Sequence, residues 1–385
     1  MERSDSSRVH ISIITETFPP EVNGVAMTLH QLALGLAREG HRVEVVRPRQ
    51  KQPHEPSDSF FEVEVGGLPL PGYQGLRFGL PCKGKLLRKW RSESPDVLYV
   101  ATEGPLGLSA VAAARKLGIP VTSGFHTNFN QYMNHYAIPG IAPLMAGYLR
   151  WFHNRTWCTY TPSPTTQTEL TNLGLHNVRV LGRGVDTEQY HPAKADDSLR
   201  RDWGVQPGGI APLFVSRIAA EKNLALTAKA FREICQSVPG SNAVFVGDGP
   251  ELPKLKKDFP EFQYTGMKHG EDLARHYASG DLFIFPSTTE TFGNVITEAM
   301  ASGLVVVAYD YAAPHLYIVD GVNGFLAPFN QPDAFIQAVK RALQARDQWP
   351  AIRNAARKTA EGLTWQAIVL QFVQTLQEAA TSQKH

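Results

Sequence analysis

The sequence is poor in cysteine, in long apolar runs and in net charge. Its three cysteines, Cys82, Cys158 and Cys235, lie far apart and form neither a disulfide framework nor a metal-ligand spacing, which suits a reducing cytoplasm. No segment approaches the ~18 consecutive apolar residues that a membrane-spanning helix needs, and the polar N-terminus lacks a signal-peptide core. A net charge of +2 gives no global sign of nucleic-acid binding. We therefore expect a soluble, cytoplasmic protein that does not bind nucleic acid.

The 385 residues do contain an alternation of short apolar runs with helix-like patterns. Val9–Thr15 predicts a buried strand, Thr28–Glu39 a helix and His41–Arg47 the next strand. The same order returns in the second half, where Ala211–Ser216 predicts a strand and Leu224–Ser237 a helix. Such alternation predicts an α/β fold in which parallel sheets are covered by helices on both faces. We therefore expect two Rossmann-like halves.

The alternation pauses at residues 186–210, which are polar and rich in Asp, Pro and Gly. We interpret this stretch as the linker between the halves and place the boundary after residue 190. Ligands of such sheets bind beyond the carboxyl ends of the strands. With two halves, the expected site is the cleft between them.

The stretch Phe285–Met300 carries the most informative pattern in the second half. A buried strand is expected to end at Pro286, and Gly293 lies just before a helix whose free N–H groups can bind an anion. Glu290 lies in the loop, and Glu298 lies about one turn into the helix. Because carboxylates repel a diphosphate, the two side chains make better acceptors for sugar hydroxyls. Taken singly, each is better explained structurally: Glu290 as a loop charge and Glu298 as a first-turn acid that complements the helix dipole.

A second charged segment opens another helix of the same half. Arg217 and Lys222 are five residues apart across a turn, so both can face one anion. A guanidinium grips a diphosphate through paired hydrogen bonds, and a lysine supplies a point charge. The alternative is a solvated loop pair. Gly247–Pro250 follows a further strand end, but it is too short for a Walker loop and lacks that loop's Lys-Ser/Thr.

Together these motifs resemble the signature of retaining GT-B glycosyltransferases of family 4. Seven residues separate Glu290 from Glu298, with Phe292-Gly293 between them and Glu-Ala-Met at the end. The resemblance covers essentially the whole chain and implies two Rossmann-like domains that face each other across a cleft. The first would hold residues 1–190 and a C-terminal helix, about 364–385, that crosses back to it. Residues 191–363 would form the nucleotide-sugar donor domain.

The resemblance also implies roles for single residues. Glu290 would bind hydroxyls of the transferred sugar, Glu298 would hold the ribose hydroxyls, and Arg217 and Lys222 would neutralise the departing diphosphate. The other donor contacts that it implies are Gly24, Arg183, Gly247, Met267, Lys268, Phe292, Gly293, Asn294 and Val295. The segment that includes Met267 would contact the base largely through its backbone, so the sequence leaves the base open.

The first half contributes one histidine to the expected site. Thr15–Val25 holds only Gly24 of the three glycines that a dinucleotide fingerprint needs, which argues against a dehydrogenase or epimerase. A lone histidine is more often structural than catalytic. His126, however, lies in Ser123–Phe129 at a strand end facing the cleft, and the resemblance implies that it contacts the transferred sugar near its reacting centre. Arg183 would add a positive group nearby.

The segments TFPPEVNG, FHTNF and GRGVD most resemble a subgroup that contains GDP-mannose-dependent α-mannosyltransferases and sulfolipid-type synthases. This implies retaining transfer of a hexose, with GDP-mannose the favoured donor, to a lipid or glycolipid acceptor. Transfer from a UDP-sugar to diacylglycerol is the main alternative, and a non-catalytic sugar-nucleotide-binding protein is the alternative of another class. No Asp-x-Asp pair lies at a strand end, and Asp196-Asp197 lies in the expected linker, so we expect neither a metal nor a cofactor.

A basic segment, Lys83–Arg91, bears on lipids. Lys85, Arg88 and Lys89 surround leucines and Trp90 at helical spacing. A short basic amphipathic helix with a tryptophan can lie in the headgroup layer of an anionic membrane, here the inner face of the cell membrane. The alternative is a surface helix that packs Trp90 inward and keeps its charges in water.

Overall fold

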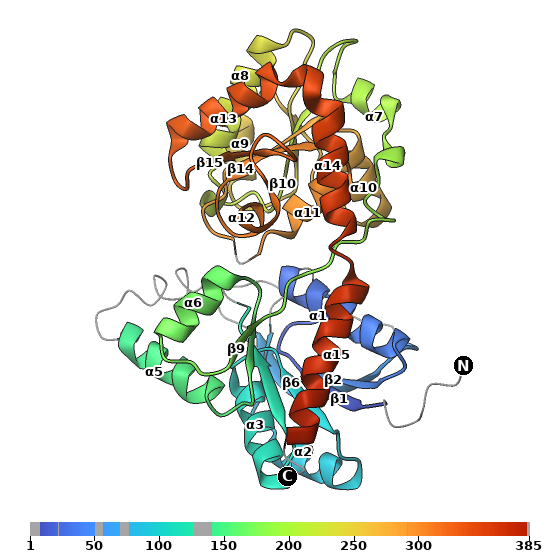
Figure 1. The fold of residues 1–385 in the computed structure, drawn as a ribbon, viewed down its shortest axis with the longest axis vertical. Coiled ribbons are helices and arrows are strands. Elements are labelled where there is room, and N and C mark those ends of the chain that lie inside the picture. The colour runs from blue at the N-terminus through green and yellow to red at the C-terminus, as the bar shows by residue number, and fades with distance from the viewer. Residues whose placement is uncertain are drawn as a thin grey trace. The chain divides into compact units, whose positions relative to one another are not determined.

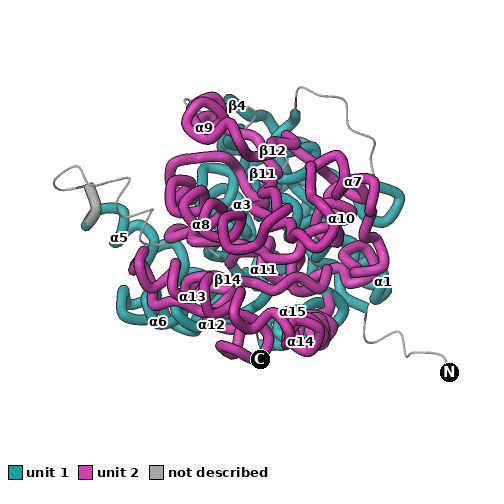
Figure 2. The backbone as a smooth tube through the Cα atoms, turned by 90° about the horizontal axis from the view of Figure 1, so that it is seen from above, with its two compact units in different colours: residues 1–183, 365–385 teal, residues 184–364 magenta. Residues whose placement is uncertain are grey.

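The chain forms two compact units (Figures 1 and 2). One contains residues 1–183 and 365–385, and the other contains residues 184–364. The computed structural model describes residues 8–21, 23–50, 57–69, 77–126, 141–290 and 292–382. The first unit is therefore built from two separate stretches of chain, and the second from one continuous stretch.

The first unit contains a parallel sheet of seven strands in the order β3-β2-β1-β6-β7-β8-β9. Its strands are β1 (His10–Ile14), β2 (Arg42–Pro48), β3 (Phe61–Val65), β6 (Val97–Val100), β7 (Val121–Gly124), β8 (Thr159–Thr161) and β9 (Val178–Val180). A two-stranded antiparallel hairpin, β4 (Gly67–Pro69) with β5 (Arg77–Gly79), stands apart from it. Because β1 pairs with both β2 and β6, the strand order reverses between β1 and β6.

Apolar residues fill both faces of this sheet. Neighbouring residues point to opposite faces of a strand, and Ile13 and Ile14 accordingly belong to different core clusters. α1 (Gly24–Arg38) and α15 (Trp365–Ser382) contribute to the Ile13 face. The other face is covered by α2 (Lys83–Ser92), α3 (Pro105–Leu117) and α5 (Ile141–His153), while α6 (Pro164–Asn172) packs beside β9.

The helix α15 lies directly against α1. At Gly35 of α1, an added Cβ would come within 2.4 Å of Val369 Cγ2. Only glycine lets the two helices approach this closely without displacing the valine. Gly35 of α1 therefore permits the close packing of α15.

The second unit contains a parallel sheet of six strands in the order β12-β11-β10-β13-β14-β15. The strands are β10 (Pro212–Val215), β11 (Val244–Val246), β12 (Gln263–Tyr264), β13 (Leu282–Phe285), β14 (Val305–Tyr309) and β15 (Phe325–Ala327). The helices are α7 (Asp197–Asp202), α8 (Leu224–Ser237), α9 (Leu252–Asp258), α10 (Gly270–Ala278), α11 (Asn294–Ala301), α12 (Ala313–Tyr317), α13 (Pro332–Gln344) and α14 (Trp349–Glu361). The predicted helix Leu224–Ser237 is α8, with the same bounds.

The linker prediction for residues 186–210 is wrong. Tyr190, Trp203 and Ile210 are buried in the core of the second unit. The stretch forms a 3-10 turn, η2 (Pro192–Lys194), and the helix α7. The second unit consequently begins at Gly184, before the predicted boundary at residue 190.

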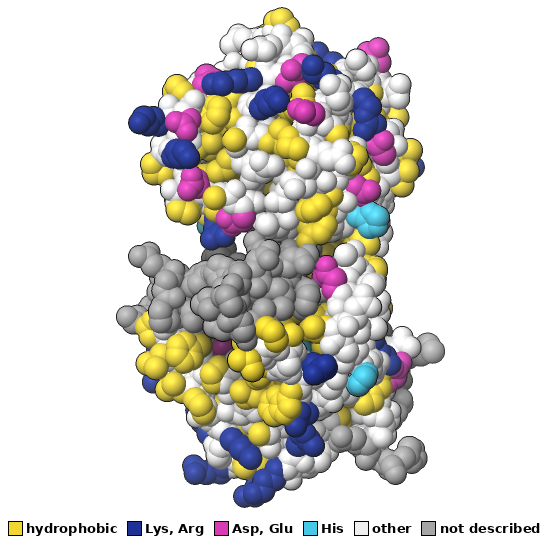
Figure 3. Space-filling model, turned by 90° about the vertical axis from the view of Figure 1, so that its left-hand side faces the viewer, with side chains coloured by type: hydrophobic (Ala, Val, Ile, Leu, Met, Phe, Trp, Pro, Cys, Tyr) yellow, Lys and Arg dark blue, Asp and Glu magenta, His cyan; other side chains and the backbone are white. Residues whose placement is uncertain are grey.

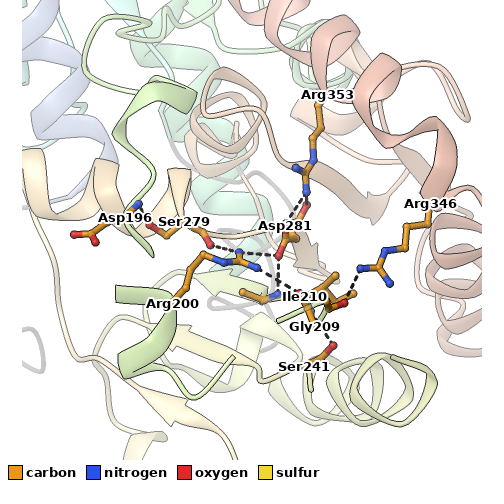
Figure 4. A network of polar contacts seen from close by, with 11 residues as sticks. Asp196, Arg200, Gly209, Ile210, Ser241, Ser279, Asp281, Arg346 and Arg353 are labelled. Carbon is orange, nitrogen blue, oxygen red and sulfur yellow. Dashed lines mark hydrogen bonds and ion pairs between the residues drawn. The ribbon is translucent and has the colours of Figure 1, made fainter. Parts of the chain in front are cut away.

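Polar contacts explain why so hydrophilic a stretch is folded (Figure 4). Arg200 Nη1 donates to Asp281 Oδ2 at 2.8 Å and to the carbonyl oxygen of Ser279 at 2.7 Å. Asp281 also accepts from the amide of Ala211 at 2.8 Å and from Arg353 Nη2 at 2.9 Å. Charges that resemble loop composition in the sequence therefore tie α7 to β13 and α14.

The tryptophan of helix α2 is buried in the first unit and is not available to a membrane. Trp90 is 1% exposed and packs with Leu86 in the core of the first unit. Its Nε1 donates to Glu44 Oε1 at 3.2 Å, and Lys89 Nζ lies 2.7 Å from Glu44 Oε2. The structure thus overturns the predicted membrane contact for Trp90 and Lys89, since both serve the fold. Lys85 and Arg88 remain exposed.

None of the described helices is both long and apolar enough to cross a membrane. The three cysteines are free thiols, and Cys158 is buried.

Candidate functional site

The charged residues singled out in the second half gather where its strand order reverses. β10 lies between β11 and β13, so the reversal falls between β10 and β13. Lys222 ends the 3-10 turn η3 (Ala220–Lys222) that follows β10, and Glu290 lies in the loop after β13. This edge of an open parallel sheet is the place where ligands bind.

Two ion pairs dominate this edge. The Lys222 ammonium contacts Glu290 Oε1, and the two side chains are only 13% and 16% exposed. Ser287 Oγ also donates to Glu290 Oε1, at 2.8 Å. Arg217, by contrast, is 60% exposed and pairs with Glu221 on the same turn. Each predicted phosphate ligand therefore already has a carboxylate partner, and an incoming diphosphate must compete with that partner.

The helix α11 presents its N-terminus beside Glu290. Its N-cap, Gly293, has φ +94°, a left-handed conformation that favours glycine. Amides at the start of a helix generally have no acceptor four residues earlier, so a helix N-terminus can bind an anion. Phe292, however, is buried in the core, so its side chain supports the loop and only its backbone can face a ligand. Thr291 lies outside the described residues.

Glu298 is a buried carboxyl group held by tyrosines. Tyr277 donates from its hydroxyl to Glu298 Oε2 at 2.9 Å, and Tyr190 is a second hydroxyl partner. Burial raises the pKa of Glu298 to about 7, against the lowering effect of these hydrogen bonds. Sequence reasoning identified Glu298 but missed both tyrosines. Tyr277 fits the buried face of α10, and Tyr190 lies in the stretch taken for a linker.

The glycine turn after β11 is packed tightly against the loop after β10. A Cβ on Gly247, whose φ is +138°, would come within 1.9 Å of the Ser216 carbonyl oxygen. The Ile218 amide donates to the Asp248 carbonyl oxygen at 2.8 Å. Gly247 therefore holds the segment that carries Arg217 in place, which is a structural reason for the glycine beside the predicted donor contact.

Met267 and Lys268 lie in the loop between β12 and α10. The Met267 side chain is half-exposed, and Lys268 Nζ lies 3.1 Å from Asp272 Oδ2 at the start of α10. The expected base contact, made largely through the backbone of this loop, stays a prediction.

In the first unit, Gly24, His126 and Arg183 come together. Asn23 caps α1 by accepting from the Val25 and Ala26 amides at 3.1 and 2.9 Å, so Gly24 is the first residue of the helix. A Cβ on Gly24 would lie 3.5 Å from Arg183 Nη1. Arg183 and His126 both line a small cavity of about 10 Å³. Thr127, Asn128 and Phe129 lie outside the described residues.

His126 is held by a residue that sequence reasoning did not single out. The Tyr99 hydroxyl lies 2.7 Å from His126 Nε2. Burial, together with the charges of Arg183 and His153, lowers the pKa of His126 to about 3. The imidazole is therefore neutral at physiological pH, which leaves Arg183 as the cation of this group.

Two further carboxyl groups stand where the first sheet reverses its order, between β1 and β6. Glu16 follows β1, and its Oε1 accepts from the Leu106 amide at 3.1 Å at the start of α3. Glu103 follows β6. Burial raises the pKa of each to about 7, and for Glu16 the neighbouring Glu103 adds to this rise against the amide hydrogen bond. Neither was predicted, because neither belongs to a recognisable charge pattern.

Across the described residues, no group of three or more His, Cys, Asp or Glu side chains is placed to hold a metal ion. Asp196, the carboxylate weighed as a poor metal candidate, caps α7 by accepting from the amides of Ser198 and Leu199. It also pairs with Arg275. Its role is thus structural.

Known proteins similar to this chain agree with one another. Residues 22–189 match the family described as Glycosyltransferase Family 4, and residues 211–345 match Glycosyl transferases group 1. A GDP-mannose-dependent alpha-mannosyltransferase of Mycobacterium tuberculosis is 31% identical over 94% of both chains. The sulfoquinovosyl transferase of Arabidopsis thaliana is 28% identical over 93% of this chain and 71% of its own. An alpha-monoglucosyldiacylglycerol synthase of Acholeplasma laidlawii is 27% identical over 92% of both.

Solved structures extend the likeness to the fold. HepE of Anabaena, solved with UDP and glucose, aligns with a TM-score of 0.76 over 96% of this chain and 100% of its own, at 20% identity. The sucrose-phosphate synthase of Thermosynechococcus elongatus aligns with a TM-score of 0.77 over 97% and 100%, at 17% identity. Each unit thus has the α/β architecture of the GT-B fold.

Proposed function

Because this chain belongs to glycosyltransferase family 4, we propose that it moves a hexose from GDP-mannose to a lipid or glycolipid acceptor, forming an alpha linkage with retention of configuration. That it is a glycosyltransferase follows from the family. The donor, the acceptor and the residue roles are the proposal. GDP-mannose comes first because the mannosyltransferase relative is 31% identical over nearly the whole chain.

One observation carries the donor site: the two glutamates flanking Gly293 have opposite environments. Glu290 is ionically paired with Lys222 at the sheet edge, whereas Glu298 is buried against two tyrosines. In our proposal Lys222 and Arg217 turn to the diphosphate when the donor binds, and Glu290 is released to accept sugar hydroxyls. Glu298 accepts the ribose hydroxyls.

His126 and Arg183 form the part of the machinery that the first unit contributes. We assign His126 to a hydroxyl of the transferred sugar and Arg183 to the donor phosphates, because the first side chain is neutral and the second is charged. No carboxylate general base is required if the departing phosphate oxygen takes the acceptor's proton. Preorganised cations then supply most of the stabilisation of the transition state.

Thermal-shift measurements with GDP, UDP and their sugars would test the donor. We expect GDP and GDP-mannose to raise the melting temperature more than UDP and UDP-glucose, because a ligand that binds only the folded state stabilises it. Radiolabelled mannose should then appear in an organic extract of lipid acceptors. Stabilisation by the uridine ligands alone would contradict the mannose assignment.

Transfer from a UDP-sugar to diacylglycerol is the second candidate. The names of the sulfoquinovosyl transferase and monoglucosyldiacylglycerol synthase relatives favour it. Product formation from UDP-glucose and diacylglycerol, but not from GDP-mannose, would select this candidate. Binding of a donor without transfer or hydrolysis would instead indicate a non-catalytic sugar-nucleotide-binding protein.

We propose that transfer needs no divalent metal, because Arg217, Lys222 and the α11 N-terminus can meet the charge of the diphosphate. Activity should persist in EDTA. Complete loss in EDTA, restored by magnesium, would refute this part of the proposal.

We also propose that the lipid acceptor is reached from a membrane surface, with α5 rather than α2 as the apolar contact. Leu144 and Trp151 on α5 are 74% and 46% exposed, and the Arg155 guanidinium lies 3.9 Å above the Trp151 ring. Figure 3 shows hydrophobic side chains gathered on this side of the first unit, with Lys and Arg side chains near them. Apolar and basic groups together favour an anionic interface.

Flotation with phosphatidylglycerol vesicles would test this. Leu144→Glu with Trp151→Glu should abolish flotation, whereas Leu370→Glu, at a half-exposed leucine of α15 in the same unit, should not. Lys85→Glu with Arg88→Glu should weaken flotation only modestly. Equal flotation of all variants would contradict the proposed membrane contact.

A further inference from the structure

A buried hydrogen bond joins Tyr99 and His126 in the first unit. Tyr99 is fully buried in β6, and its hydroxyl lies 2.7 Å from His126 Nε2. Its ring packs edge-on against Tyr160, at 5.8 Å between centroids, and against Phe372 of α15, at 4.9 Å. The hydroxyl is thus fixed in position by aromatic neighbours, and within the described chain His126 is its hydrogen-bond partner.

Burial decides which group donates. If Nε2 carried the proton, Tyr99 would accept, and its own buried hydrogen would have no acceptor among the described residues. That arrangement would leave two buried atoms unsatisfied, the Tyr99 hydroxyl hydrogen and His126 Nδ1, whereas donation by Tyr99 leaves only Nδ1 unsatisfied. Each unsatisfied buried group costs about 1–3 kcal/mol. The tyrosine hydroxyl therefore donates to Nε2, and a neutral imidazole with an acceptor at Nε2 must hold its proton on Nδ1.

The other ring nitrogen of His126, Nδ1, is the atom that remains for a ligand. It is buried and has no hydrogen-bond partner in the part of the chain that the structure describes. His126 lines the cavity of about 10 Å³ that it shares with Arg183 and Thr161. A space of this size takes about one water-sized group, so it fits a single hydroxyl oxygen and not a phosphate.

We propose that Tyr99 is a positioning residue that fixes the tautomer of His126, so that His126 Nδ1–H donates to one hydroxyl oxygen of the transferred hexose. This inference rests on the proposed function and deepens it. It makes His126 a neutral hydrogen-bond donor rather than a base or a cation. Tyr99 acts through His126 and does not itself touch the sugar.

Gly124 supports the assignment independently. An added Cβ there would lie 2.3 Å from the Tyr99 hydroxyl and 2.7 Å from His126 Nε2. Its φ lies outside the left-handed range that other glycines of this chain adopt, so backbone conformation does not require glycine at this position. Space for the Tyr99–His126 hydrogen bond is what the missing side chain provides.

The low basicity of His126 agrees with this role. Burial and the charge of Arg183 keep the pKa of His126 near 3, so the ring stays neutral through the pH range of any assay. Arg183 can then meet the phosphate charge while His126 selects a hydroxyl. A charged imidazole would also attract the phosphates, and the two residues would then no longer have separate roles.

Nitrogen-15 NMR of the full chain, labelled at histidine, would test the tautomer directly. The His126 signals are assigned by their loss in His126→Asn. In the wild type we expect Nδ1 protonated and Nε2 unprotonated. In Tyr99→Phe we expect both tautomers, because the hydroxyl that selects one is gone. Protonation at Nε2 in the wild type, or an unchanged tautomer in Tyr99→Phe, would overturn the proposal.

Further variants separate positioning from packing. Gly124→Ala should give the same mixed tautomers as Tyr99→Phe, although both partners are intact. Phe372→Leu should lower the melting temperature by loosening the aromatic packing, yet leave His126 protonated on Nδ1. A changed tautomer in Phe372→Leu would show that packing, not the hydroxyl, sets it.

Kinetics connect the tautomer to transfer. Tyr99→Phe should lower kcat/KM about tenfold, the size expected for one misdirected hydrogen bond. The NMR result needs no substrate, so it stands even if the proposed function fails. Mixed tautomers with undiminished kcat/KM in Tyr99→Phe would remove the link to catalysis.

Discussion

The two units hold their candidate site residues by different physical means. In the second unit, the charged residues sit in loops and already form ion pairs, Lys222 with Glu290 and Arg217 with Glu221. In the first unit, the central side chain, His126, is neutral, buried and tied to a tyrosine. The second unit uses charged side chains that can exchange partners. The first unit uses a buried hydrogen bond whose two groups keep the same partner.

This contrast suggests a division of labour. On our proposal the second unit binds and releases the donor. The exposed Arg217–Glu221 pair is weak enough to yield to a diphosphate, and the diphosphate must also displace Glu290 from the more buried Lys222. A buried hydrogen bond has one satisfied geometry, so the first unit is suited to orient the sugar. The predictions below would break or sharpen this contrast, and they run from the largest expected effect to the smallest.

Removing a phosphate-facing cation should have the largest effect. Arg217→Ala should lower kcat by about 10²-fold or more, the scale for losing a preorganised charge at the transition state. Steady-state kinetics with the donor would measure this. Arg232→Ala is the matched control, since Arg232 is also a half-exposed arginine of the second unit, paired with Glu261. Near-normal kcat in Arg217→Ala would contradict the assignment.

Glu298 should make the second unit less stable as the pH rises. Its pKa is raised from 4.5 to about 7, so the folded state holds the proton more tightly than the unfolded state does. Stability is then lost as pH rises from 4.5 through 7. Glu298→Gln should recover up to ~3 kcal/mol at pH 8 and nothing at pH 4.

Urea denaturation of Glu298→Gln at the two pH values would measure this recovery. The same variant should bind the donor more weakly, because the ribose loses a charged acceptor. Glu188→Gln, an exposed glutamate of the same unit, is the control and should show no such pH dependence. If the Glu298→Gln protein were less stable than the wild type at pH 8, the predicted gain in stability would be wrong.

Asp281 should matter to the second unit alone. Asp281→Asn weakens the contacts with Arg200 and Arg353, and it should cost ~2 kcal/mol because the group is mostly buried. Hydrogen exchange would show faster opening in residues 184–364 and unchanged opening in the first unit. Asp320→Asn removes an exposed pair with Arg341 and should cost under ~1 kcal/mol. Equal loosening of both units by Asp281→Asn would contradict their separate stability.

The smallest effect is expected at the helix cap of the first unit. Asn23→Ala removes the side chain that accepts from two amides of α1 and should cost ~1 kcal/mol. Thermal unfolding would detect the loss, and Asn23→Ser, which keeps a capping oxygen, should restore most of it. Full stability in the alanine variant would mean that Gly24 is held by other contacts.

The apolar periodicity of the helices and the charge motifs can be recognised in the sequence. The contacts that support them in the folded protein cannot. The helix Leu224–Ser237 was predicted with its observed bounds, because its apolar spacing is regular. Residues 186–210 were misread, because caps and ion pairs such as that of Arg200 have the composition of a loop. The burial of Trp90 was not predicted, because the basic residues of this helix do not show in the sequence which face of the helix is buried.

The same limit applies to the site. Glu290, Glu298 and Lys222 belong to a charge pattern with recognisable spacing. Tyr277 and Tyr99 do not, because a buried tyrosine looks like any core aromatic until the fold brings its hydroxyl to a partner. Motif spacing could therefore propose candidate ligand contacts, but it could not reveal the buried tyrosines that hold two of them.

The packing of α15 onto α1 has a consequence for the birth of the protein. The second unit is one continuous stretch, whereas the first unit lacks α15 until residues 184–364 have been made. At ~5–20 residues per second a ribosome needs roughly 10–35 s for that stretch. During this interval the part of the Ile13 face that Val369 and Phe372 of α15 cover, which includes Tyr99, stays exposed. The first unit is thus the last of the two to complete its core on a nascent chain.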